Sequence, residues 1–351
     1  MPTIILTGGG TAGHVTPHLA ILPYLKKDFD KIYYIGSSNS IEKRIIEKQN
    51  IPFYSIPCAK LVRSFTLKNL EIPFKVLSGI NKAEKLIENL KPDIIFSKGG
   101  YVSLPVVIAG KRKGVPVIAH ESDLTIGLAN RLTSKHCKKV LTSFPETAKT
   151  IKNGQYVGAP IRKSLLQLDK KQALDFFGFD GNKPILLILG GSQGAKSINQ
   201  AVRSAMPQIL PKFDIIHLCG KNNLDQSIKQ KGYYQAEYLD NIEMAYSVCS
   251  LCVSRAGSNS LFELLNLKIP CVLIPLPKGN SRGDQVLNAE YFQRLGLVSV
   301  LPQNVLTPQS LVNNINSTYA NRFNAVLNYQ KNPINDASRE ISKIIFDTLN
   351  Q

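Results

Sequence analysis

Short apolar runs recur along the first half of the chain, and amphipathic or polar stretches separate them. Runs of this kind, bounded by glycine and polar residues, are typical of strands that are buried on both faces. Residues 40–49 and 79–90, which lie between such runs, have the spacing of helices. Strands alternating with helices predict a parallel sheet with helices on both faces. The predicted strands are residues 3–7, 31–36, 52–56, 93–97, 115–120 and 139–142.

The same alternation begins again in the second half. Between the halves, residues 154–164 contain Gly158, Pro160 and several small residues, and we expect the linker there. Residues 336–349 predict a closing amphipathic helix, whose isoleucines lie on one side. Pro23 lies inside the first predicted helix, which should therefore kink or end early. The predicted strands of the second half are residues 185–189, 214–218, 250–254, 271–274 and 298–301.

A glycine-rich turn follows the first predicted strand of each half. Residues 8–14 read GGGTAGH, and residues 190–197 read GGSQGAKS. Each turn leads into a helical stretch. A buried strand, a turn that backbone groups can bring close to a ligand, and a helix N-terminus together form an anion site. Two such turns suggest two nucleotide-type domains that share a cleft, as in an enzyme that uses a sugar nucleotide.

Polar residues follow several other predicted strands, at the edge where open α/β sheets bind ligands. His14 at a helix entry can act as a base or hydrogen-bond an oxyanion, although a capping or packing histidine also fits. Residues 97–101 read SKGGY, and residues 120–123 read HESD. Within the second motif, Glu121 is either a proton acceptor or sugar ligand, or a buried carboxylate that caps a helix or forms an ion pair.

The strand-to-helix turn at residues 255–263 reads RAGSNSLFE. The carboxylate of Glu263 can accept hydrogen bonds from both ribose hydroxyls of a nucleotide. The alternative is structural, because Ser260 and Glu263 also have the spacing of a capping box. Downstream, the polar loop at residues 279–285 is either a solvated connector or a substrate clamp.

Composition narrows the class of protein. The 351 residues suffice for two domains. No apolar run is long enough to span a bilayer, and no basic segment precedes the first strand, so we expect a cytoplasmic protein without a signal peptide. The net charge of +18 lies mostly before residue 160, which favours an anionic partner. Nucleic acid is the least favoured partner, because the chain has neither a nucleic-acid module nor any Trp. The six cysteines lie near apolar runs and are interpreted as small buried hydrophobes.

Residues 61–80 mix apolar and basic side chains, a combination that suits the headgroup boundary of an anionic membrane. An ordinary core-facing loop and helix is the alternative. The candidate membrane residues are Arg63, Phe65, Lys68, Phe74 and Lys75.

Taken in order, these motifs resemble the MurG family, bacterial transferases that move N-acetylglucosamine (GlcNAc) from UDP-GlcNAc to lipid I, undecaprenyl-diphospho-muramoyl-pentapeptide. The resemblance extends over nearly the whole chain and also includes Asp284-Gln285 followed by Asn288. It implies a GT-B fold, in which two Rossmann-like α/β domains, each with a parallel sheet, face a central cleft. The domains would be residues 1–160, which bind acceptor and membrane, and residues 161–335, which bind UDP-GlcNAc. The helix at residues 336–351 would pack back on the first domain.

The resemblance also implies roles. Thr11, Ala12, Gly13 and His14 would line the acceptor side and the donor sugar, and Ser192 and Gln193 would contact the donor phosphates. Arg162 would reach the nucleotide, and the backbone of Leu239 would read the uracil. Ser258, Asn259 and Ser260 would precede the ribose ligand Glu263, and Gln285 would contact the GlcNAc hydroxyls. Tyr101, Asp123, Asp284 and Asn288 complete the expected binding set. Many family members carry Asn where this chain has Asp123, and Gln where it has Asp284, so altered sugar contacts are expected.

The expected reaction is a single inverting displacement, in which the C4 hydroxyl of the lipid-linked muramic acid attacks C1 of UDP-GlcNAc. His14 is the expected base and Glu121 its rival. No cofactor or essential metal is expected, because no D-x-D motif stands in a suitable place. The partners would be UDP-GlcNAc, lipid I and the cytoplasmic face of the plasma membrane. A UDP-GlcNAc 2-epimerase, a non-catalytic nucleotide-binding scaffold and, least favoured, an NAD-dependent dehydrogenase are the alternatives.

Overall fold

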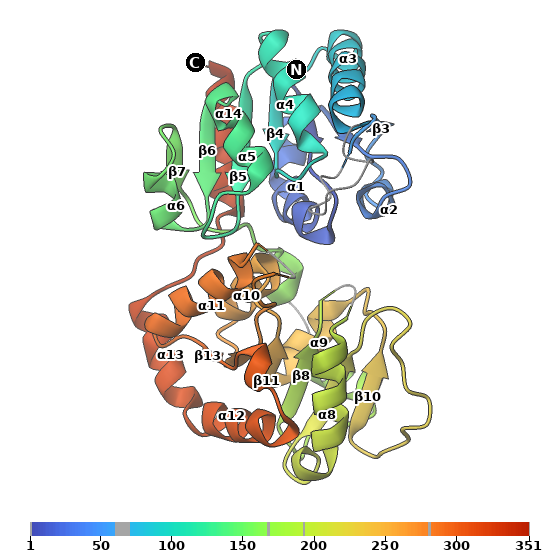
Figure 1. The fold of residues 1–351 in the computed structure, drawn as a ribbon, viewed down its shortest axis with the longest axis vertical. Helices are drawn as coiled ribbons and strands as arrows, with labels where there is room; N and C mark the ends of the chain where they lie inside the picture. The colour runs from blue at the N-terminus through green and yellow to red at the C-terminus, as the bar shows by residue number, and fades with distance from the viewer. Residues whose placement is uncertain (1, 60–70, 167–168, 192–193, 280–281, 351) are drawn as a thin grey trace. The chain divides into compact units, whose positions relative to one another are not determined.

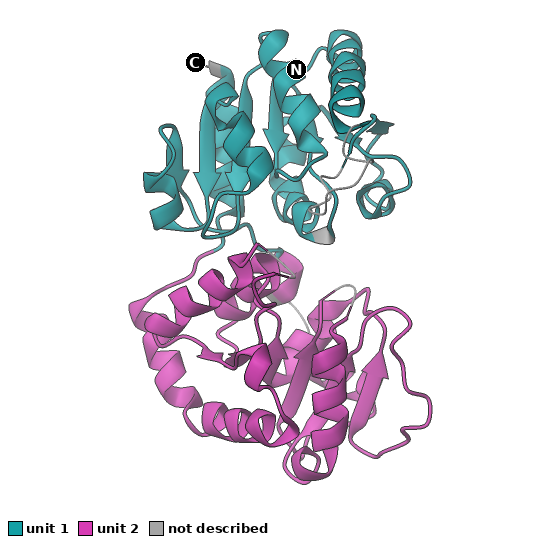
Figure 2. Ribbon diagram, in the orientation of Figure 1, with its two compact units in different colours: residues 1–162, 336–351 teal, residues 163–335 magenta. Residues whose placement is uncertain are grey.

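A computed structural model describes residues 2–59, 71–166, 169–191, 194–279 and 282–350. The chain divides into two compact units, shown in different colours in Figure 2. Unit 1 comprises residues 1–162 and 336–351, and unit 2 comprises residues 163–335. Each unit is an α/β domain built on its own parallel sheet.

The sheet of unit 1 has seven strands in the order β3-β2-β1-β4-β5-β6-β7, all paired in parallel. The first strand pairs with two neighbours, so that Ile5 lies beside Tyr33 on one side and Ile95 on the other. The strands are β1 (Thr3–Thr7), β2 (Lys31–Gly36), β3 (Phe53–Ser55), β4 (Ile94–Ser97), β5 (Val117–Glu121), β6 (Lys139–Thr142) and β7 (Gly154–Tyr156).

Alternate residues of β1 build the two cores of unit 1, because successive side chains of a strand point to opposite faces. Ile4 and Leu6 pack with α1 (Thr16–Asp28), α2 (Ile41–Glu47) and α14 (Ser338–Asp347). Ile5 packs with α3 (Ile72–Leu90) and α4 (Ser103–Arg112) on the other face. The C-terminal helix α14, red in Figure 1, thus returns to unit 1 and lies beside α1. The remaining helices of the unit are α5 (Leu128–Thr133) and α6 (Pro145–Lys149), with the 3-10 turns η1 (Ala12–His14), η3 (Ser134–His136) and η6 (Thr348–Asn350).

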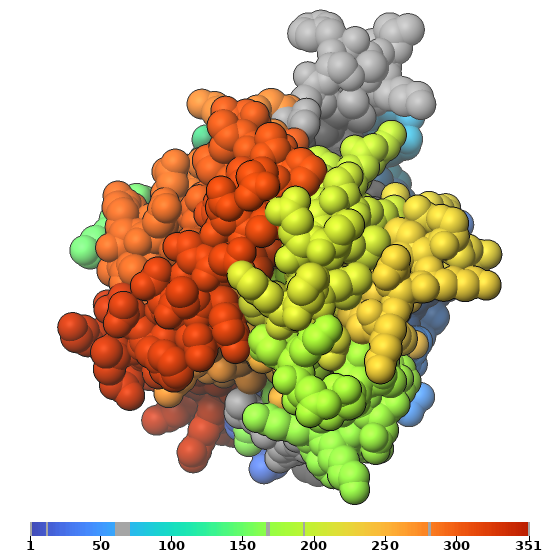
Figure 3. All heavy atoms as spheres, turned by 90° about the horizontal axis from the view of Figure 1, so that it is seen from below, coloured from blue at the N-terminus to red at the C-terminus, as the bar shows by residue number. Residues whose placement is uncertain are grey.

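The sheet of unit 2 has six parallel strands in the order β10-β9-β8-β11-β12-β13. They are β8 (Ile185–Leu189), β9 (Asp214–Leu218), β10 (Tyr233–Ala236), β11 (Cys249–Ser254), β12 (Cys271–Leu273) and β13 (Ser299–Val300). Its core joins the sheet to α8 (Lys196–Ile209) and α12 (Pro308–Ala320), which lie side by side in yellow-green and orange in Figure 3. The other elements are α7 (Lys170–Phe177), α9 (Ile242–Val248), α10 (Ser258–Asn266), α11 (Asp284–Arg294), α13 (Arg322–Lys331), η4 (Lys163–Leu166) and η5 (Gln303–Val305).

The start of the predicted linker is wrong. Residues Gly154–Tyr156 form β7, an edge strand paired with β6, and Val157 packs against the core of unit 1. The chain leaves unit 1 only after Arg162, and the N–H of Ile161, just before it, donates to the Asp336 carboxylate over 2.9 Å. A three-residue edge strand that contains Gly and Gln carries no apolar run, so the sequence pattern did not indicate it.

The early end predicted for the first helix is also wrong, because α1 continues through Pro23 to Asp28. Pro23 stands on the exposed side of the helix, while Ile21, Leu22 and Leu25 are buried in the core. Packing of these side chains holds the helix together despite the missing N–H.

Two other sequence expectations concern membranes and cysteines. Among the residues that the structure describes, no helix has both the length and the apolar character to cross a membrane. All six cysteines are free thiols, and four of them are buried. Burial raises the pKa of Cys137 and of Cys271 to about 12, as expected of packed thiols that do not react.

Candidate active site

The two glycine turns of unit 1 meet where the strand order reverses, between β1 and β4. The turn at residues 8–14 follows β1, and the turn at residues 98–101 follows β4. A Cβ atom on Gly100, whose φ is +81°, would overlap the carbonyl oxygen of Gly9, and one on Gly10 would overlap the Tyr101 ring. The sequence therefore needs glycine here for close approach. In open α/β sheets this reversal point is the usual ligand site.

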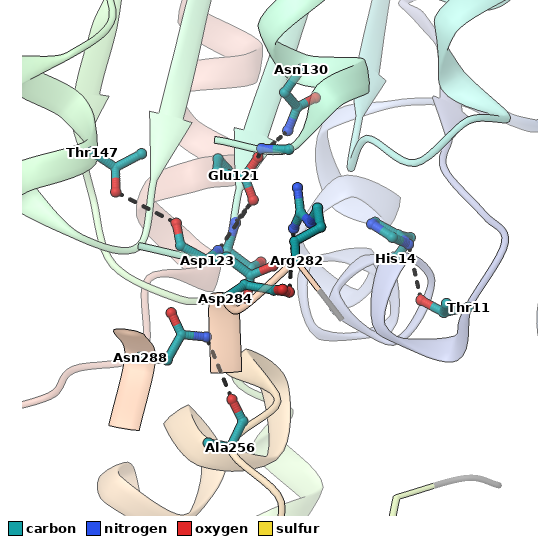
Figure 4. Close-up of polar contacts among 12 residues, drawn as sticks. Thr11, His14, Glu121, Asp123, Asn130, Thr147, Ala256, Arg282, Asp284 and Asn288 are labelled. Atoms are coloured by element: carbon teal, nitrogen blue, oxygen red, sulfur yellow. Dashed lines mark hydrogen bonds and ion pairs between the residues drawn. The ribbon is translucent and has the colours of Figure 1, made fainter. Parts of the chain in front are cut away.

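His14 ends the short η1 turn, close to Thr11. Its Nδ1 atom lies 3.0 Å from the Thr11 hydroxyl, a contact drawn as a dashed line in Figure 4, and its backbone N–H donates to the Thr11 carbonyl over 3.1 Å. The His14 side chain is partly exposed, and its ring contacts the Thr11 hydroxyl. Gly13 is exposed beside it, and Ala12 completes the turn. Four expected residues, Thr11 to His14, thus form one compact turn.

Glu121, the rival base, holds a loop together. Its Oε1 accepts the N–H groups of Ser122 and Asp123, and its Oε2 accepts those of Gly127 and the Asn130 amide, at 2.8 to 3.1 Å. Four donors thus occupy both oxygens of this buried carboxylate, and Figure 4 shows Glu121 with two of the donor residues, Asp123 and Asn130. In this arrangement Glu121 shapes the loop at residues 122–127 and so places Asp123.

Glu42 is a site residue that the sequence analysis missed. It lies on α2, is fully buried, and accepts hydrogen bonds from the N–H and hydroxyl of Ser37 and, over 3.5 Å, from the N–H of Gly10. A Cβ atom on Gly9 would come within 2.6 Å of the Glu42 carboxylate. This carboxylate therefore stabilises the glycine turn at residues 8–14. Only the pairing of β1 with β2, which brings α2 close to the turn after β1, could have indicated that Glu42 belongs to the site.

A cavity of about 390 Å³ opens beside this turn, entirely within unit 1. Gly10 and Tyr101 form one wall, and residues 37–42 and 56–58 form the others, together with Lys75. The lining is mostly hydroxyl, amide and charged groups, which suits a hydroxylated ligand more than an apolar one. Tyr101, expected to bind substrate, is one of the residues that line this cavity.

In unit 2 the strand order reverses between β8 and β11. The glycine turn after β8 is required for packing, since a Cβ atom on Gly194, at φ +74°, would overlap the carbonyl oxygen of Cys219. Ser192 and Gln193, the expected phosphate contacts, lie outside the described residues. Helix α8 begins just beyond the turn, so its first N–H groups point to the same edge of the sheet.

The capping-box alternative for the turn at residues 255–263 is wrong. Helix α10 has Gly257 as its N-cap, and the Ser260 hydroxyl donates to the Gly257 carbonyl over 3.2 Å. Glu263 instead accepts a hydrogen bond from the Tyr246 hydroxyl over 3.2 Å and stays partly exposed. Glu263 therefore does not cap the helix, and its role as a ribose ligand stays a prediction. Ser258 and Asn259 are partly exposed in the first turn of the same helix.

The start of α11 is fastened to two strand ends of the same unit. Gln285 accepts the N–H of Leu276 over 3.0 Å, and the fully buried Asn288 donates to the Ala256 carbonyl over 3.5 Å. Asp284 pairs through Oδ2 with Arg282 at 3.3 Å, while its buried Oδ1 has no hydrogen-bond partner among the described residues. These bonds fix the start of α11, and the ligand roles expected of Asp284, Gln285 and Asn288 stay predictions.

The other residues expected to bind the nucleotide, and Arg255 beside them, lie in separate segments of the chain. Leu239 is buried in the segment between β10 and α9, and Arg162 is the last residue of unit 1 before the crossing. Arg255, just after β11, donates to the Ile274 carbonyl over 2.9 Å and to the Ser197 hydroxyl over 3.4 Å, so it joins the ends of β11 and β12 to the start of α8. Within the described part of the chain, no group of three His, Cys, Asp or Glu side chains could hold a metal ion.

Of the expected membrane residues, Phe74 and Lys75 lie on α3, while Arg63, Phe65 and Lys68 lie outside the described residues. Phe74 is 75 % exposed and Leu77, one turn on, is 53 % exposed. Lys75 forms an ion pair with Glu71 at 2.7 Å. The first turns of α3 therefore present apolar side chains to solvent, against the core-facing alternative.

Comparison with known proteins now decides the family. Residues 4–142 match the glycosyltransferase family 28 N-terminal domain, and residues 185–344 match the family's C-terminal domain. A relative from Clostridium botulinum (strain Langeland) is 49 % identical over 98 % of this chain and 99 % of its own. Its name is UDP-N-acetylglucosamine--N-acetylmuramyl-(pentapeptide) pyrophosphoryl-undecaprenol N-acetylglucosamine transferase. The chain belongs to the MurG group of glycosyltransferase family 28.

Solved structures agree on the fold. The crystal structure of Acinetobacter baumannii MurG matches with a TM-score of 0.76 at 24 % identity, over 99 % of this chain and all of that one. A UDP-GlcNAc 2-epimerase from Neisseria meningitidis matches with a TM-score of 0.66 at 16 % identity, over the full length of both chains. The MurG family and the epimerase thus share an architecture, and the fold alone does not separate them. The resemblance inferred from the motifs, and the α/β GT-B class with two parallel sheets, are confirmed.

Proposed function

We propose that this protein is an inverting transferase that moves GlcNAc from UDP-GlcNAc to the C4 hydroxyl of lipid I, forming lipid II for peptidoglycan. The observation that carries the proposal is the 49 % identity, over 98 % of the chain, to a relative named for that reaction. The relative is matched across both units, so both halves of the proposed site have counterparts in it. Unit 1 would bind the acceptor, and unit 2 would bind UDP-GlcNAc.

His14 is the proposed general base. When its Nδ1–H donates to the Thr11 hydroxyl, the lone pair of the ring lies on Nε2, and that atom takes the proton of the attacking hydroxyl. Glu121 is disfavoured as the base, because its oxygens already accept four hydrogen bonds. A carboxylate that gives up these bonds to take a proton would also release its loop. Glu121 therefore anchors the loop at residues 122–127.

The donor would be held by unit 2. Glu263 would accept the ribose hydroxyls, and the backbone at Leu239 would read the uracil. Gln285, whose Oε1 is engaged by Leu276, would donate from its amide N–H to the sugar, and Asp284 would accept a hydroxyl on its unpaired Oδ1. The helix N-terminus beyond the glycine turn would stabilise the leaving diphosphate, which needs no metal ion in this scheme.

The acceptor carries a diphosphate on a lipid, and the more basic part of the chain lies before residue 160. Exposed apolar side chains on α3 next to basic residues suit attachment to an anionic bilayer surface. We therefore place the enzyme as a peripheral protein on the cytoplasmic face of the plasma membrane, with unit 1 toward the lipid.

The test is incubation of the protein with radiolabelled UDP-GlcNAc, with and without a short-chain lipid I analogue, in the presence of EDTA. We expect acceptor-dependent transfer of label that EDTA does not reduce. Conversion of UDP-GlcNAc without acceptor would favour an epimerase, and UDP binding without turnover would favour a scaffold. Transfer that stops in EDTA and returns with Mg²⁺ would contradict only the metal-independent part of the proposal.

A further inference from the structure

Lys98 is a lysine buried in the polar end of the unit 1 sheet. It follows β4, and only 3 % of its surface is exposed. Its Nζ atom lies 2.5 Å from His120 Nδ1 and 2.6 Å from the Ser122 hydroxyl. Its Cβ atom packs against Gly8, the first residue of the turn that carries His14, because a Cβ atom added to Gly8 would lie 3.1 Å from it. This side chain thus lies between the turn that carries His14 and the loop that carries Asp123.

The hydrogen bonds fix the direction of donation. His120 Nε2 lies 3.0 Å from the carbonyl oxygen of Gly158, which only accepts, so that nitrogen carries the proton. The other ring nitrogen, Nδ1, must then accept from Lys98. Lys98 therefore donates to an uncharged imidazole and to a hydroxyl. No carboxylate forms an ion pair with Lys98 among the described residues.

Burial of this ammonium costs free energy that an apolar side chain would not cost. Lysine is almost never fully buried unless it is paired. Glu121 and Asp123 compensate in part, because they carry negative charge nearby, but the hydrogen bonds of Glu121 go to N–H groups of its own loop. The structure therefore keeps a destabilising charge at the edge of the sheet where the reaction is proposed to occur. Groups retained at the expense of stability are characteristic of functional sites.

We propose that Lys98 is a positioning residue for the transfer. Through the Ser122 hydroxyl, its ammonium group fixes the loop that places Asp123 against the acceptor. Two buried groups of opposite sign thus fix the same loop, with Glu121 accepting its N–H groups and Lys98 donating to its first side chain. The inference rests on the proposed function and adds to it a residue that acts through its neighbours.

The charge of Lys98 should depend on pH within the working range of the enzyme. Burial lowers the pKa of Lys98 from 10.5 to about 7, opposed by the negative charges of Glu121 and Asp123. The other titratable groups facing it are His18 on α1 and His120 on β5, and burial lowers the pKa of both imidazoles, which are neutral at pH 7. Loss of the lysine proton as the pH rises should therefore give turnover an alkaline limb.

The experiment compares Lys98→Met, Lys98→Arg and Ser122→Ala with the unaltered protein, and uses Lys111→Met on the exposed surface of α4 as the matched control. The readouts are Tm, the KM for each substrate, and kcat from pH 6 to 9. For Lys98→Met we expect a Tm that changes little, because the loss of the buried charge offsets the loss of the hydrogen bond to His120 Nδ1. We expect an unchanged KM for UDP-GlcNAc and a kcat/KM for the lipid I analogue reduced about a hundredfold. We also expect its alkaline limb to disappear. Lys98→Arg should recover part of the activity and keep a charge at high pH, and Ser122→Ala should show a smaller loss.

A Lys98→Met protein whose Tm falls together with its activity would overturn the proposal in favour of a merely structural lysine. Ser122→Ala with unchanged kcat and KM would overturn the route through the loop. Absence of transfer by the unaltered protein would refute the proposed function, and this inference with it. Transfer with an unchanged pH profile in Lys98→Met would refute the inference alone.

Discussion

Gly100 lies directly against the carbonyl oxygen of Gly9, so the turns that follow β4 and β1 interlock. Each of the two turns carries residues of the proposed acceptor site, His14 on one and Tyr101 on the other. Backbone contact between the two turns therefore helps to set their relative position. Such a contact tolerates no Cβ atom on Gly100, where the positive φ adds strain for any other residue.

Gly100→Ala should destabilise unit 1 by about 3 kcal/mol or more, because a backbone overlap can be relieved only by moving a strand end. Gly114→Ala is the matched control, since Gly114 also has a positive φ, of +73°, but has no atom within 4 Å of the added Cβ position. The control should lose only about 1 kcal/mol from left-handed strain. Urea titration of both variants measures the difference, and equal losses would mean that φ, not the close approach, requires glycine at residue 100.

The sequence predicted the regular, buried parts of the fold closely. Strands such as β1, β2 and β8 were predicted with the bounds that the structure has, because continuous apolar runs between glycines have few other interpretations. The edge strands β7 and β10 were not predicted. Half-exposed strands carry polar residues, and an edge strand is stabilised by pairing with only one neighbouring strand. Local pattern likewise overestimated the effect of Pro23, which tertiary packing overrides.

The candidate site was predictable only where one segment carries it. The turn from Thr11 to His14 is contiguous, so its residues could be named together. Glu42 and Lys98 act across strand pairs, and no local spacing indicates that a helix residue supports a turn more than 30 positions away. The capping box failed for the opposite reason, because a local pattern fitted but the N-cap of the helix is Gly257, three residues before Ser260.

His14→Ala should reduce kcat by about a hundredfold to ten-thousandfold, since it removes the group that takes the hydroxyl proton. UDP affinity, a property assigned to unit 2, should not change. Thr11→Val should cost less, because it removes only the group that orients the ring. Steady-state kinetics with a lipid I analogue, alongside UDP titrations, separate the two effects.

Glu121→Gln tests the rival base. The amide would present a donor to N–H groups that now meet a carboxylate, so we expect a lower Tm together with lower activity. If the variant instead keeps its Tm and loses the acidic limb of the pH–rate profile while His14→Ala retains that limb, Glu121 would be the base.

Glu263→Gln should weaken UDP binding about tenfold, because a hydrogen bond from ribose to a carboxylate is stronger than one to an amide. Glu290→Gln, exposed on α11 of the same unit, is the matched control and should bind normally. Calorimetry with UDP and with 2′-deoxy-UDP completes a double-mutant cycle. Additive losses from the missing hydroxyl and the altered side chain would contradict a direct contact between them.

His18 should make the protein sensitive to acid. Burial and the nearby charge of Lys98 lower the pKa of His18 to about 3, and neither ring nitrogen has a hydrogen-bond partner among the described residues. The unfolded chain takes up a proton below about pH 6.5 and the native one does not, so this contribution to stability is complete above pH 6.5 and is lost as the pH falls toward 3. The slope is about 1.4 kcal/mol per pH unit for each such histidine.

His217 adds to the same trend, because burial lowers its pKa to about 3 as well. His18→Leu should therefore flatten the fall in unfolding free energy between pH 6 and 4 without abolishing it, and should stabilise the protein at pH 7. Urea titrations across that range provide the measurement, with the partly exposed His136→Gln as control. An unchanged slope in His18→Leu would mean that the imidazole is already protonated in the native state.

Phe74 and Leu77 should dominate attachment to membranes. Insertion of an exposed aromatic side chain into the acyl boundary is worth about 2 kcal/mol, so the Phe74→Ser, Leu77→Ser double variant should bind vesicles at least tenfold more weakly. Lys75→Gln should matter less, because Glu71 already neutralises part of that charge. Phe323→Ser is the matched control, since Phe323 is 68 % exposed but lies on α13 of unit 2. Sedimentation with vesicles that contain anionic lipid measures all of these variants. Equal losses from Phe323→Ser and from the α3 double variant would contradict attachment through unit 1, because exposed phenylalanines in both units would then contribute alike.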